Sequence, residues 1–151
     1  MQVLNLPEYA FKIRIHENLK QIFDPYRKKF VRLTPEEWVR LNFAMFLTKE
    51  RGFPMGRLAI EKSLRYNRLA KRCDILAHDQ FGSPLLLVEC KAPDIPINQK
   101  TFDQIMVYNL TFQVRYLLIT NGLKHYACQV DFEEKKLHYL GDIPYYSHLI
   151  S

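Results

Sequence analysis

The stretch that decides the fold is residues 72–91, which read RCDILAHDQFGSPLLLVECK. Two largely apolar runs flank a Gln-Phe-Gly-Ser turn with a proline behind it, and this pattern predicts a β-hairpin. If residues 80–83 form the loop, Asp79 pairs with Pro84, and counting inward places Asp74 opposite Glu89. Directly opposed residues share a face of the sheet, with Cβ atoms about 5 Å apart. Lys91 lies on the same face because strand side chains alternate with period two.

Two carboxylates and one ammonium are therefore expected to converge at the end of an apolar strand. Carboxylates this close need a cation or a proton between them, and oxygen-rich sites suit a hard divalent ion such as Mg²⁺. The alternative is a cross-strand Asp/Glu pair near solvent that Lys91 neutralises. A bulge or a different loop length would move Asp74 away from Glu89, so the metal site depends on the register.

The composition indicates one domain with a basic surface. The chain has 151 residues, 48% of them hydrophobic, and a net charge of +6. These values allow a proper core and suit a polyanionic partner. Between Arg57 and Arg72 there are six basic residues and one acid, so this segment supplies five of the six net charges and leads directly to Asp74. A solvated basic strand and loop explains the same segment equally well.

Cysteine content and hydropathy favour a cytoplasmic protein without membrane contact. The three cysteines lack C-x-x-C spacing, so neither a disulfide framework nor a zinc site is expected. Cys90 alternates away from Glu89 and should enter the core as a small apolar residue. The first residues lack a signal-peptide pattern, and no uncharged apolar run approaches membrane-spanning length.

Two helices are predicted beside the strands. Thr34-Pro35-Glu36-Glu37 opens the first, with Thr34 as N-cap and Glu37 completing a capping box. Arg40 lies one turn further on and could balance either glutamate or contact a phosphate. The second helix spans 98–112. The remaining expectations are a loosely docked arm over 1–10, strands over 11–15, 19–23, 29–33, 58–66, 114–120, 124–131 and 136–140, and a tail from Pro144.

Side chains on two of these elements are further candidates for the site. Gln104 and Tyr108 are four residues apart and so are neighbours on one helix face. A Gln at the solvent edge beside a half-buried Tyr is the structural alternative. Lys62 could lie on the face of the carboxylates or could be an ordinary exposed strand lysine.

Several of these short motifs occur in an order that resembles a known family. Asp74 followed by Glu89-x-Lys91 resembles the D…(D/E)-x-K signature of the PD-(D/E)XK nuclease superfamily, although Cys73 stands where that signature has proline. The ordered set over residues 34–125 resembles the N-terminal nuclease domain of type I restriction enzyme R subunits. The set comprises Pro35-Glu36-Glu37, Glu61-Lys62, Arg72-x-Asp74, Val88-Glu89-Cys90-Lys91-Ala92-Pro93 and Gln104-x-x-x-Tyr108.

The resemblance implies a restriction-endonuclease-like α/β fold. Its central mixed β-sheet would be flanked by two main helices and extended by extra N-terminal strands. Residues 1–151 would form a single domain. Its nuclease-like core would cover about 34–125, with N-terminal decoration over 1–33 and C-terminal strands and a tail over 126–151.

The resemblance also implies a Mg²⁺-dependent endonuclease that hydrolyses DNA, with Mn²⁺ as a substitute ion. Asp74, Glu89 and the Cys90 backbone carbonyl would hold the metal, and Glu37 is a candidate further ligand. An ammonium beside carboxylates is a poor base at neutral pH, so Lys91 is expected to position water and stabilise charge. Contacts with the DNA backbone, or support of the site, would come from Gln104, Tyr108, Arg72, Lys62 and Arg40.

Other interpretations remain open at this point. There is no G-x-x-x-x-G-K-[ST] phosphate loop, so no ATP motor is expected in this chain. Restriction-modification or helicase subunits, or a second copy of the chain, are therefore candidate partners. The alternative function is a non-catalytic nucleic-acid-binding or assembly module that keeps the nuclease fold. In a third interpretation the chain is an unrelated basic domain in which the motif is coincidental.

Overall fold

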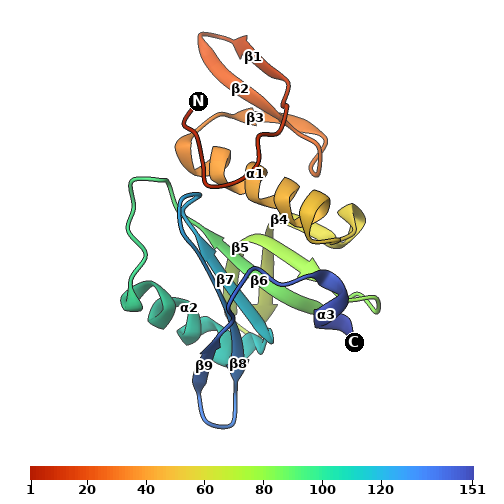
Figure 1. The fold of residues 1–151 in the computed structure, drawn as a ribbon, viewed down its shortest axis with the longest axis vertical. Coiled ribbons are helices and arrows are strands. Elements are labelled where there is room, and N and C mark those ends of the chain that lie inside the picture. Colours follow the sequence, from red (N-terminus) through yellow and green to blue (C-terminus); the bar gives the residue numbers. More distant parts are fainter.

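The structure is a computed structural model that describes residues 1–151. Helix α1 lies between a three-stranded N-terminal sheet and a six-stranded central sheet, and α2 covers the other face of the central sheet (Figure 1). The predicted α/β class, mixed sheet, two main helices and extra N-terminal strands are confirmed. The elements are β1 (Ile13–His16), β2 (Leu19–Asp24), β3 (Lys29–Arg32), α1 (Pro35–Glu50), η1 (Met55–Arg57), β4 (Leu58–Tyr66), β5 (Leu69–His78), β6 (Pro84–Cys90), α2 (Gln99–Phe112), β7 (Tyr116–Thr120), β8 (His125–Asp131), β9 (Lys136–Tyr139) and α3 (Tyr146–Ile150).

The central sheet is built mostly from hairpins. Its strand order is β4-β5-β6-β7-β8-β9, and every neighbouring pair is antiparallel except β6 and β7. Parallel strands require a long crossover connection, and α2 supplies it. The C-terminal ends of β6 and β7 therefore lie at one edge of the sheet, where β6 delivers Glu89 and the residues that follow it.

The register of the β5–β6 hairpin is as predicted near the carboxylates but not at the turn. His78, not Asp79, pairs with Pro84, and an irregularity next to Ala77 restores the expected alignment further along the strands. Ile75 is opposite Val88, the last pair of this ladder before the carboxylates. The ladder therefore follows the predicted register from Ala77 to Ile75, although the loop differs from the prediction.

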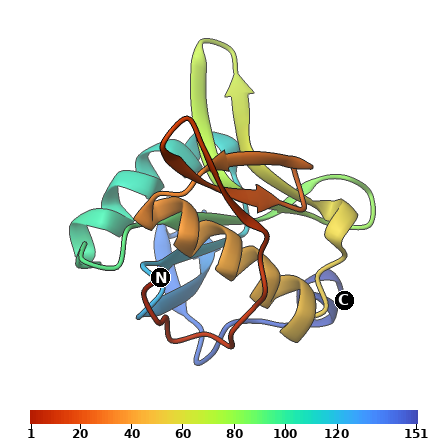
Figure 2. The ribbon, with the colours of Figure 1, turned by 90° about the horizontal axis from the view of Figure 1, so that it is seen from above.

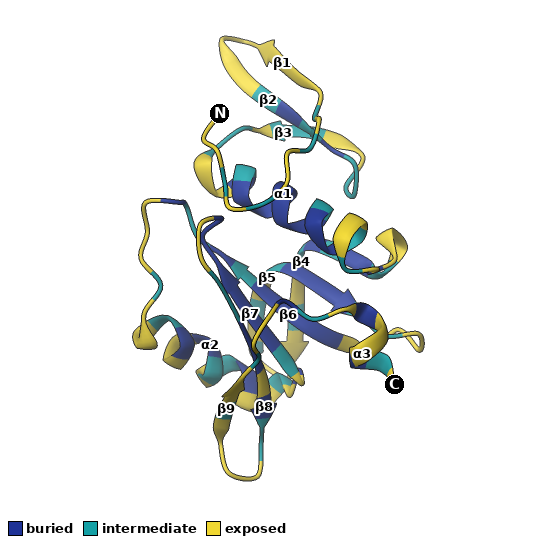
Figure 3. Cartoon of the chain, in the orientation of Figure 1, coloured by how far each residue is buried: buried dark blue, intermediate teal, exposed yellow.

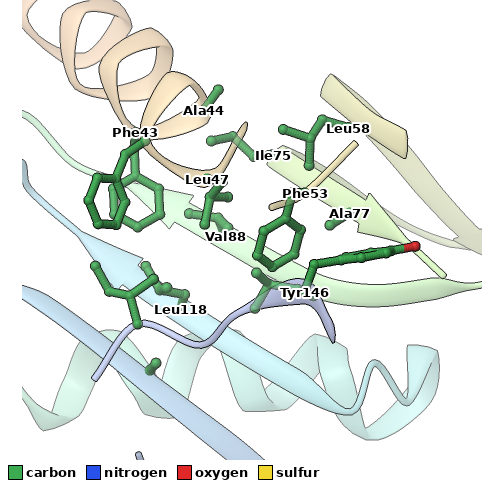
Figure 4. Close-up of a cluster of buried hydrophobic side chains, with 14 of the residues drawn as sticks. Phe43, Ala44, Leu47, Phe53, Leu58, Ile75, Ala77, Val88, Leu118 and Tyr146 are labelled. Atoms are coloured by element: carbon green, nitrogen blue, oxygen red, sulfur yellow. The ribbon is translucent and has the colours of Figure 1, made fainter. Parts of the chain in front are cut away.

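Two hydrophobic cores cover the two faces of the central sheet. The first packs α1 and α3 against the sheet (Figure 4) and includes Phe43, Leu47, Ile75, Val88 and Tyr146. The second packs α2 against the opposite face. Figure 3 shows α1 buried along most of its length, as expected for a helix that is covered on two sides. The three cysteines are buried and unpaired; they are Cys73, Cys90 and Cys128.

Both main helices begin at a residue whose side chain caps the helix, but the capping box predicted at α1 is wrong. Thr34 Oγ1 accepts a hydrogen bond from the Glu37 backbone N–H at 3.1 Å, as predicted. The Glu37 side chain is not part of a capping box, because its two carboxylate oxygens bind arginines instead. The capping box occurs at α2, where the Asn98 side chain and the N3 residue Thr101 are reciprocally bonded.

Both chain ends pack more closely than expected. The N-terminal arm is docked, because Asn5 N–H donates to the Gly122 carbonyl at 2.8 Å and Leu4 packs against the first core. Gly122 has φ +85°, and a Cβ there would lie 2.7 Å from Leu4 Cδ2, so the turn needs glycine. The predicted C-terminal tail is the helix α3, which buries Tyr146 and Leu149. None of the helices has the length and apolar character needed to cross a membrane.

Candidate active site

Asp74 and Glu89 are neighbours across the strands but engage different helices. Asp74 Oδ1 accepts from Arg40 of α1 at 2.8 Å, and Asp74 Oδ2 accepts from the Cys90 backbone N–H at 2.8 Å. Glu89 instead lines a cavity beside α2. Side-chain alternation breaks at Asp74, because Cys73 packs in the second core whereas Ile75 packs in the first. The two carboxylates lie on neighbouring strands, but the prediction that they share one face is wrong, because Asp74 turns to α1 and Glu89 to the cavity beside α2.

The Glu89 carboxylate is buried between two lysines. Its Oε1 lies 3.7 Å from Lys91 Nζ, and its Oε2 lies 3.7 Å from Lys71 Nζ. Neither distance is a hydrogen bond, and Oε2 is a buried oxygen without any hydrogen-bond partner. Burial, and then the charge of Asp74, raise the pKa of Glu89 above the ordinary value, and the two lysines oppose this rise.

A cavity of about 410 Å³ opens beside this carboxylate. Glu89 and Lys91 line it from the β6 side, and Gln104 and Tyr108 line it from α2. Lys71 also lies 5.4 Å from the centroid of the Tyr108 ring, a cation–π contact. The helix therefore brings the predicted Gln-x-x-x-Tyr pair to the predicted carboxylate and ammonium.

Arg40 joins the α1 carboxylates to Asp74. Its guanidinium lies 3.0 Å from Glu36, 2.7 Å from Glu37 and 2.8 Å from Asp74. Only 7% of the Arg40 side chain is exposed, so it supports the site from within and is not placed to meet a phosphate. Both Glu37 oxygens are bound, one by Arg40 and one by Arg27 at 2.7 Å.

Sequence analysis missed the contribution of the N-terminal strands. Arg27, in the β2–β3 turn, contacts Asp24, Glu37 and Glu61. Asp24 is fully buried and also accepts hydrogen bonds from the backbone N–H groups of Tyr26 and Arg27. The strands predicted over 19–23 and 29–33 require a connection here, but nothing local indicated that its arginine reaches α1.

The other predicted contact residues are spread around the site. Arg72 pairs with Glu61 at 2.7 Å and remains largely exposed. Glu61 also contacts Arg27 and Arg40, so Arg72 lies at the border of the group formed by these two arginines and their carboxylates, the Arg27–Arg40 cluster. Lys62 lies with its Nζ 3.5 Å from His78 Nε2, and the cavity beside Glu89 does not include it. Cys90 is buried in the first core, as its alternation predicted. Lys71, which belongs to the basic segment that ends at Arg72, is the second cation at Glu89.

Asp74 and Glu89 offer carboxylate oxygens, the donors that suit a hard divalent ion, although they face different helices in this arrangement. The unpartnered Glu89 oxygen is the observation that favours it, because a buried carboxylate oxygen needs a partner. No group of three or more His, Cys, Asp or Glu side chains converges in a metal-binding arrangement. Glu37, the candidate further ligand, is engaged by its two arginines in this arrangement.

The mixed sheet, the flanking helices and the clustered Asp, Glu, Lys, Gln and Tyr define a restriction-endonuclease-like domain. Residues 35–144 match the family described as type I restriction enzyme R protein N terminus (HSDR_N), and the chain belongs to this family. No match was found among curated proteins.

A solved structure has the same fold. It is the fragment structure of a protein described as an HsdR subunit of a type I restriction enzyme from Vibrio vulnificus YJ016. The TM-score is 0.53 at 20% identity, over 78% of this chain and 24% of that chain. This chain thus spans about a quarter of the length of that relative. Arg27 lies outside the range matched by the family, whereas Asp74, Glu89, Lys91 and Gln104 lie within it.

Proposed function

We propose that this chain is a metal-dependent endonuclease that hydrolyses DNA phosphodiester bonds. The observation that carries the proposal is the meeting of Glu89, Lys91, Gln104 and Tyr108 at one cavity, with Asp74 on the adjacent strand. These residues come from β5, β6, α2 and the loop after β6, so their meeting is a property of the fold. Membership of a restriction-enzyme family supports the same chemistry.

Asp74, Glu89 and the Cys90 backbone carbonyl would hold Mg²⁺, or Mn²⁺ in its place. A bound ion of this kind polarises the phosphate and acidifies a water molecule. Lys91 remains one-third exposed at the cavity edge, 3.7 Å from Glu89, where its ammonium can orient water and offset negative charge. Arg40 holds Asp74 in place through two guanidinium nitrogens.

The DNA backbone would lie along the exposed basic side chains beside the site. Arg72 is 68% exposed, and Gln104 and Tyr108 line the cavity mouth from α2. Contacts of this kind position a duplex without reading its sequence. A restriction-modification or helicase subunit, or a second copy of the chain, would be the protein partner.

One observation favours a second candidate function, a nucleic-acid-binding or assembly module that does not cleave. Both oxygens of Asp74 already have partners, and Arg40 is one of them. In that case a guanidinium would take the place of the ion. DNA binding would then be sensitive to salt and indifferent to divalent ions.

The test is nicking of supercoiled plasmid with Mg²⁺ or Mn²⁺, comparing the wild type with Asp74→Ala and Lys91→Ala. We expect the wild type to nick and each variant to lose at least about a hundredfold of the rate, because each removes charge stabilisation at the reacting phosphate. Asp94→Ala is the control, since Asp94 is an exposed carboxylate in the loop after β6.

The outcomes separate the two candidate functions. Equal nicking by Asp74→Ala and the wild type would rule out the proposed site. A folded wild type that binds DNA but does not nick with either ion would favour the binding module.

A further inference from the structure

A two-stranded arm projects from the molecule beside the candidate site. It is the outer part of the β4–β5 hairpin, residues 63–72, which extends beyond the rest of the chain (Figure 2, yellow-green). Its turn contains Asn67 with φ +55°, and Tyr66 beside the turn is 59% exposed. We call residues 63–72 the β4–β5 arm.

The two faces of the β4–β5 arm differ. One face turns toward α2, where Leu64 packs against the second core and its partner Lys71 contacts Glu89 and Tyr108. The other face carries four exposed residues, two arginines and two small side chains: Ser63, Arg65, Ala70 and Arg72. The first face fixes the arm to the domain, which leaves the second free for a partner.

The exposed face has the charge of a surface for a polyanion. Arg65 and Arg68, at and beside the turn, form no ion pair with any carboxylate of the chain, whereas Arg72 is paired with Glu61. Ser63 pairs with Arg72 and Ala70 with Arg65, so a small side chain lies opposite each of these arginines. Arginine is suited to phosphate because its planar donors bind two oxygens at once.

The exposed face leads to Asp74, on the α1 side of the candidate site. Ala70, Arg72 and Asp74 are every second residue along β5. Arg72 pairs with Glu61 and Asp74 pairs with Arg40, and both partners belong to the Arg27–Arg40 cluster. From Leu69 at the turn to Asp74 the strand rises about 16 Å. A DNA strand advances about 3.4 Å per nucleotide, so this distance corresponds to about five base pairs.

The geometry points to the β4–β5 arm as a clamp that enters the major groove of duplex DNA about five base pairs from the cleaved bond. The major groove of B-DNA is about 12 Å wide and accepts a two-stranded ribbon. Arg65 and Arg68 contact phosphates on the groove walls, and Arg72 joins them at the base of the arm. The choice of DNA as the polymer rests on the proposed function, whereas the clamp itself is a binding property that requires no cleavage.

The experiment measures binding without cleavage. A fluorescein-labelled DNA duplex of about 30 base pairs is titrated with the full chain in EDTA over a series of salt concentrations, with fluorescence anisotropy as the readout. The arm variant is Arg65→Ala/Arg68→Ala. The matched control, Lys49→Ala/Lys136→Ala, removes the same charge at exposed positions on α1 and β9.

We expect the arm variant to lower the slope of log K against log salt by about two and to weaken binding about tenfold at physiological salt. The control pair should keep the wild-type slope.

Three results would overturn the clamp. They are an arm variant that binds like the control pair, a wild type without salt-dependent duplex binding, and equal affinity for duplex RNA, whose deep and narrow major groove excludes a ribbon. Failure of the nuclease proposal can be told apart from failure of the clamp. If only the nuclease proposal fails, the wild type leaves the plasmid intact with Mg²⁺, while the arm variant still binds DNA more weakly than the wild type in EDTA.

Discussion

Arg40 forms ion pairs with four carboxylates, those of Glu36, Glu37, Glu61 and Asp74. Burial opposes its charge, but the hydrogen bond to Asp74 and the charges of Glu37 and Asp74 outweigh burial and raise the pKa of Arg40 above its usual value. A buried charge whose partner is removed remains unsolvated and unpaired, which is costly. Arg40 is therefore the residue on which the α1 side of the site depends.

Replacing Arg40 by Met should lower the free energy of unfolding by about 3 kcal/mol, because Glu37 and Asp74 lose their shared cation. Urea denaturation of the two proteins measures this difference. Arg68→Met, at an exposed turn, is the control and should change stability by less than about 0.5 kcal/mol. Adding Glu37→Gln to Arg40→Met should recover part of the loss, and a simple sum of the two single effects would contradict the network.

Sequence reasoning identified most of the residues near the candidate site but not their connections. Asp74, Glu89 and Lys91 followed from local spacing, and Gln104 and Tyr108 from a helical period. The contacts of Arg27 with α1 and β4 could not be predicted, because Glu37 and Glu61 are 10 and 34 residues away and ion pairs leave no periodic pattern in the sequence. Glu37 was predicted to complete a capping box, but its carboxylate binds Arg40, one turn further along α1, and Arg27 of the β2–β3 turn.

At the scale of elements, α2 is fixed to the central sheet at its C-terminal end by one buried side chain. Asn109 donates to the Val114 carbonyl at 2.8 Å and accepts from the Val114 N–H at 2.9 Å. Asn109 has no exposed surface. This double hydrogen bond sets where the helix stops and β7 begins, and so where Gln104 and Tyr108 sit over the sheet.

Asn109→Ala should destabilise the protein by about 3 kcal/mol, because it leaves a donor and an acceptor of Val114 buried without partners. Thermal unfolding followed by circular dichroism measures the loss. Gln99→Ala, in the exposed first turn of the same helix, provides the comparison and should change stability little. A small effect at Asn109 would mean that packing alone positions α2.

Elements with their own start signals were predictable, and those formed by tertiary packing were not. Thr34-Pro35-Glu36-Glu37 predicted the start of α1, and the structure has Thr34 as its N-cap. Helix α3 has five residues and no side-chain cap, so its sequence resembles a tail. It is helical in the structure because Tyr146 and Leu149 are buried in the first core.

At the scale of the whole molecule, one histidine of β8 joins the N-terminal arm to the central sheet. His125 Nε2–H donates to the Asn5 carbonyl at 3.0 Å, and His125 Nδ1 lies 2.7 Å from Thr120 Oγ1. Gly122 N–H already donates to this hydroxyl, so the hydroxyl proton is directed to Nδ1. The arrangement requires neutral imidazole, and burial lowers the pKa of His125 although the Asn5 carbonyl opposes this.

Stability should therefore fall in acid because of His125. Its pKa in the folded protein is below the unfolded value of about 6.5. At pH values between these two pKa values the unfolded chain binds more protons than the folded chain, so stability rises with pH. The contribution is complete above about pH 6.5 and is lost as pH falls through the folded pKa. Urea denaturation at several pH values should show a smaller pH dependence in His125→Gln.

Asn5→Ala is the control for this prediction, since it keeps the backbone carbonyl that His125 contacts. It should retain the wild-type pH dependence even if the arm is weakened. An unchanged pH dependence in His125→Gln would mean that other groups carry the acid sensitivity.

The burial of all three thiols makes the native chain well suited to selective chemical labelling. Burial raises the pKa of Cys73 to about 12 and that of Cys128 to about 11, and it also raises that of Cys90. Maleimides react with exposed thiolates, so the natural cysteines are protected in the folded state. A single cysteine placed at the turn of the β4–β5 arm would be the one site open to a dye or a spin label, with the native thiols left in place.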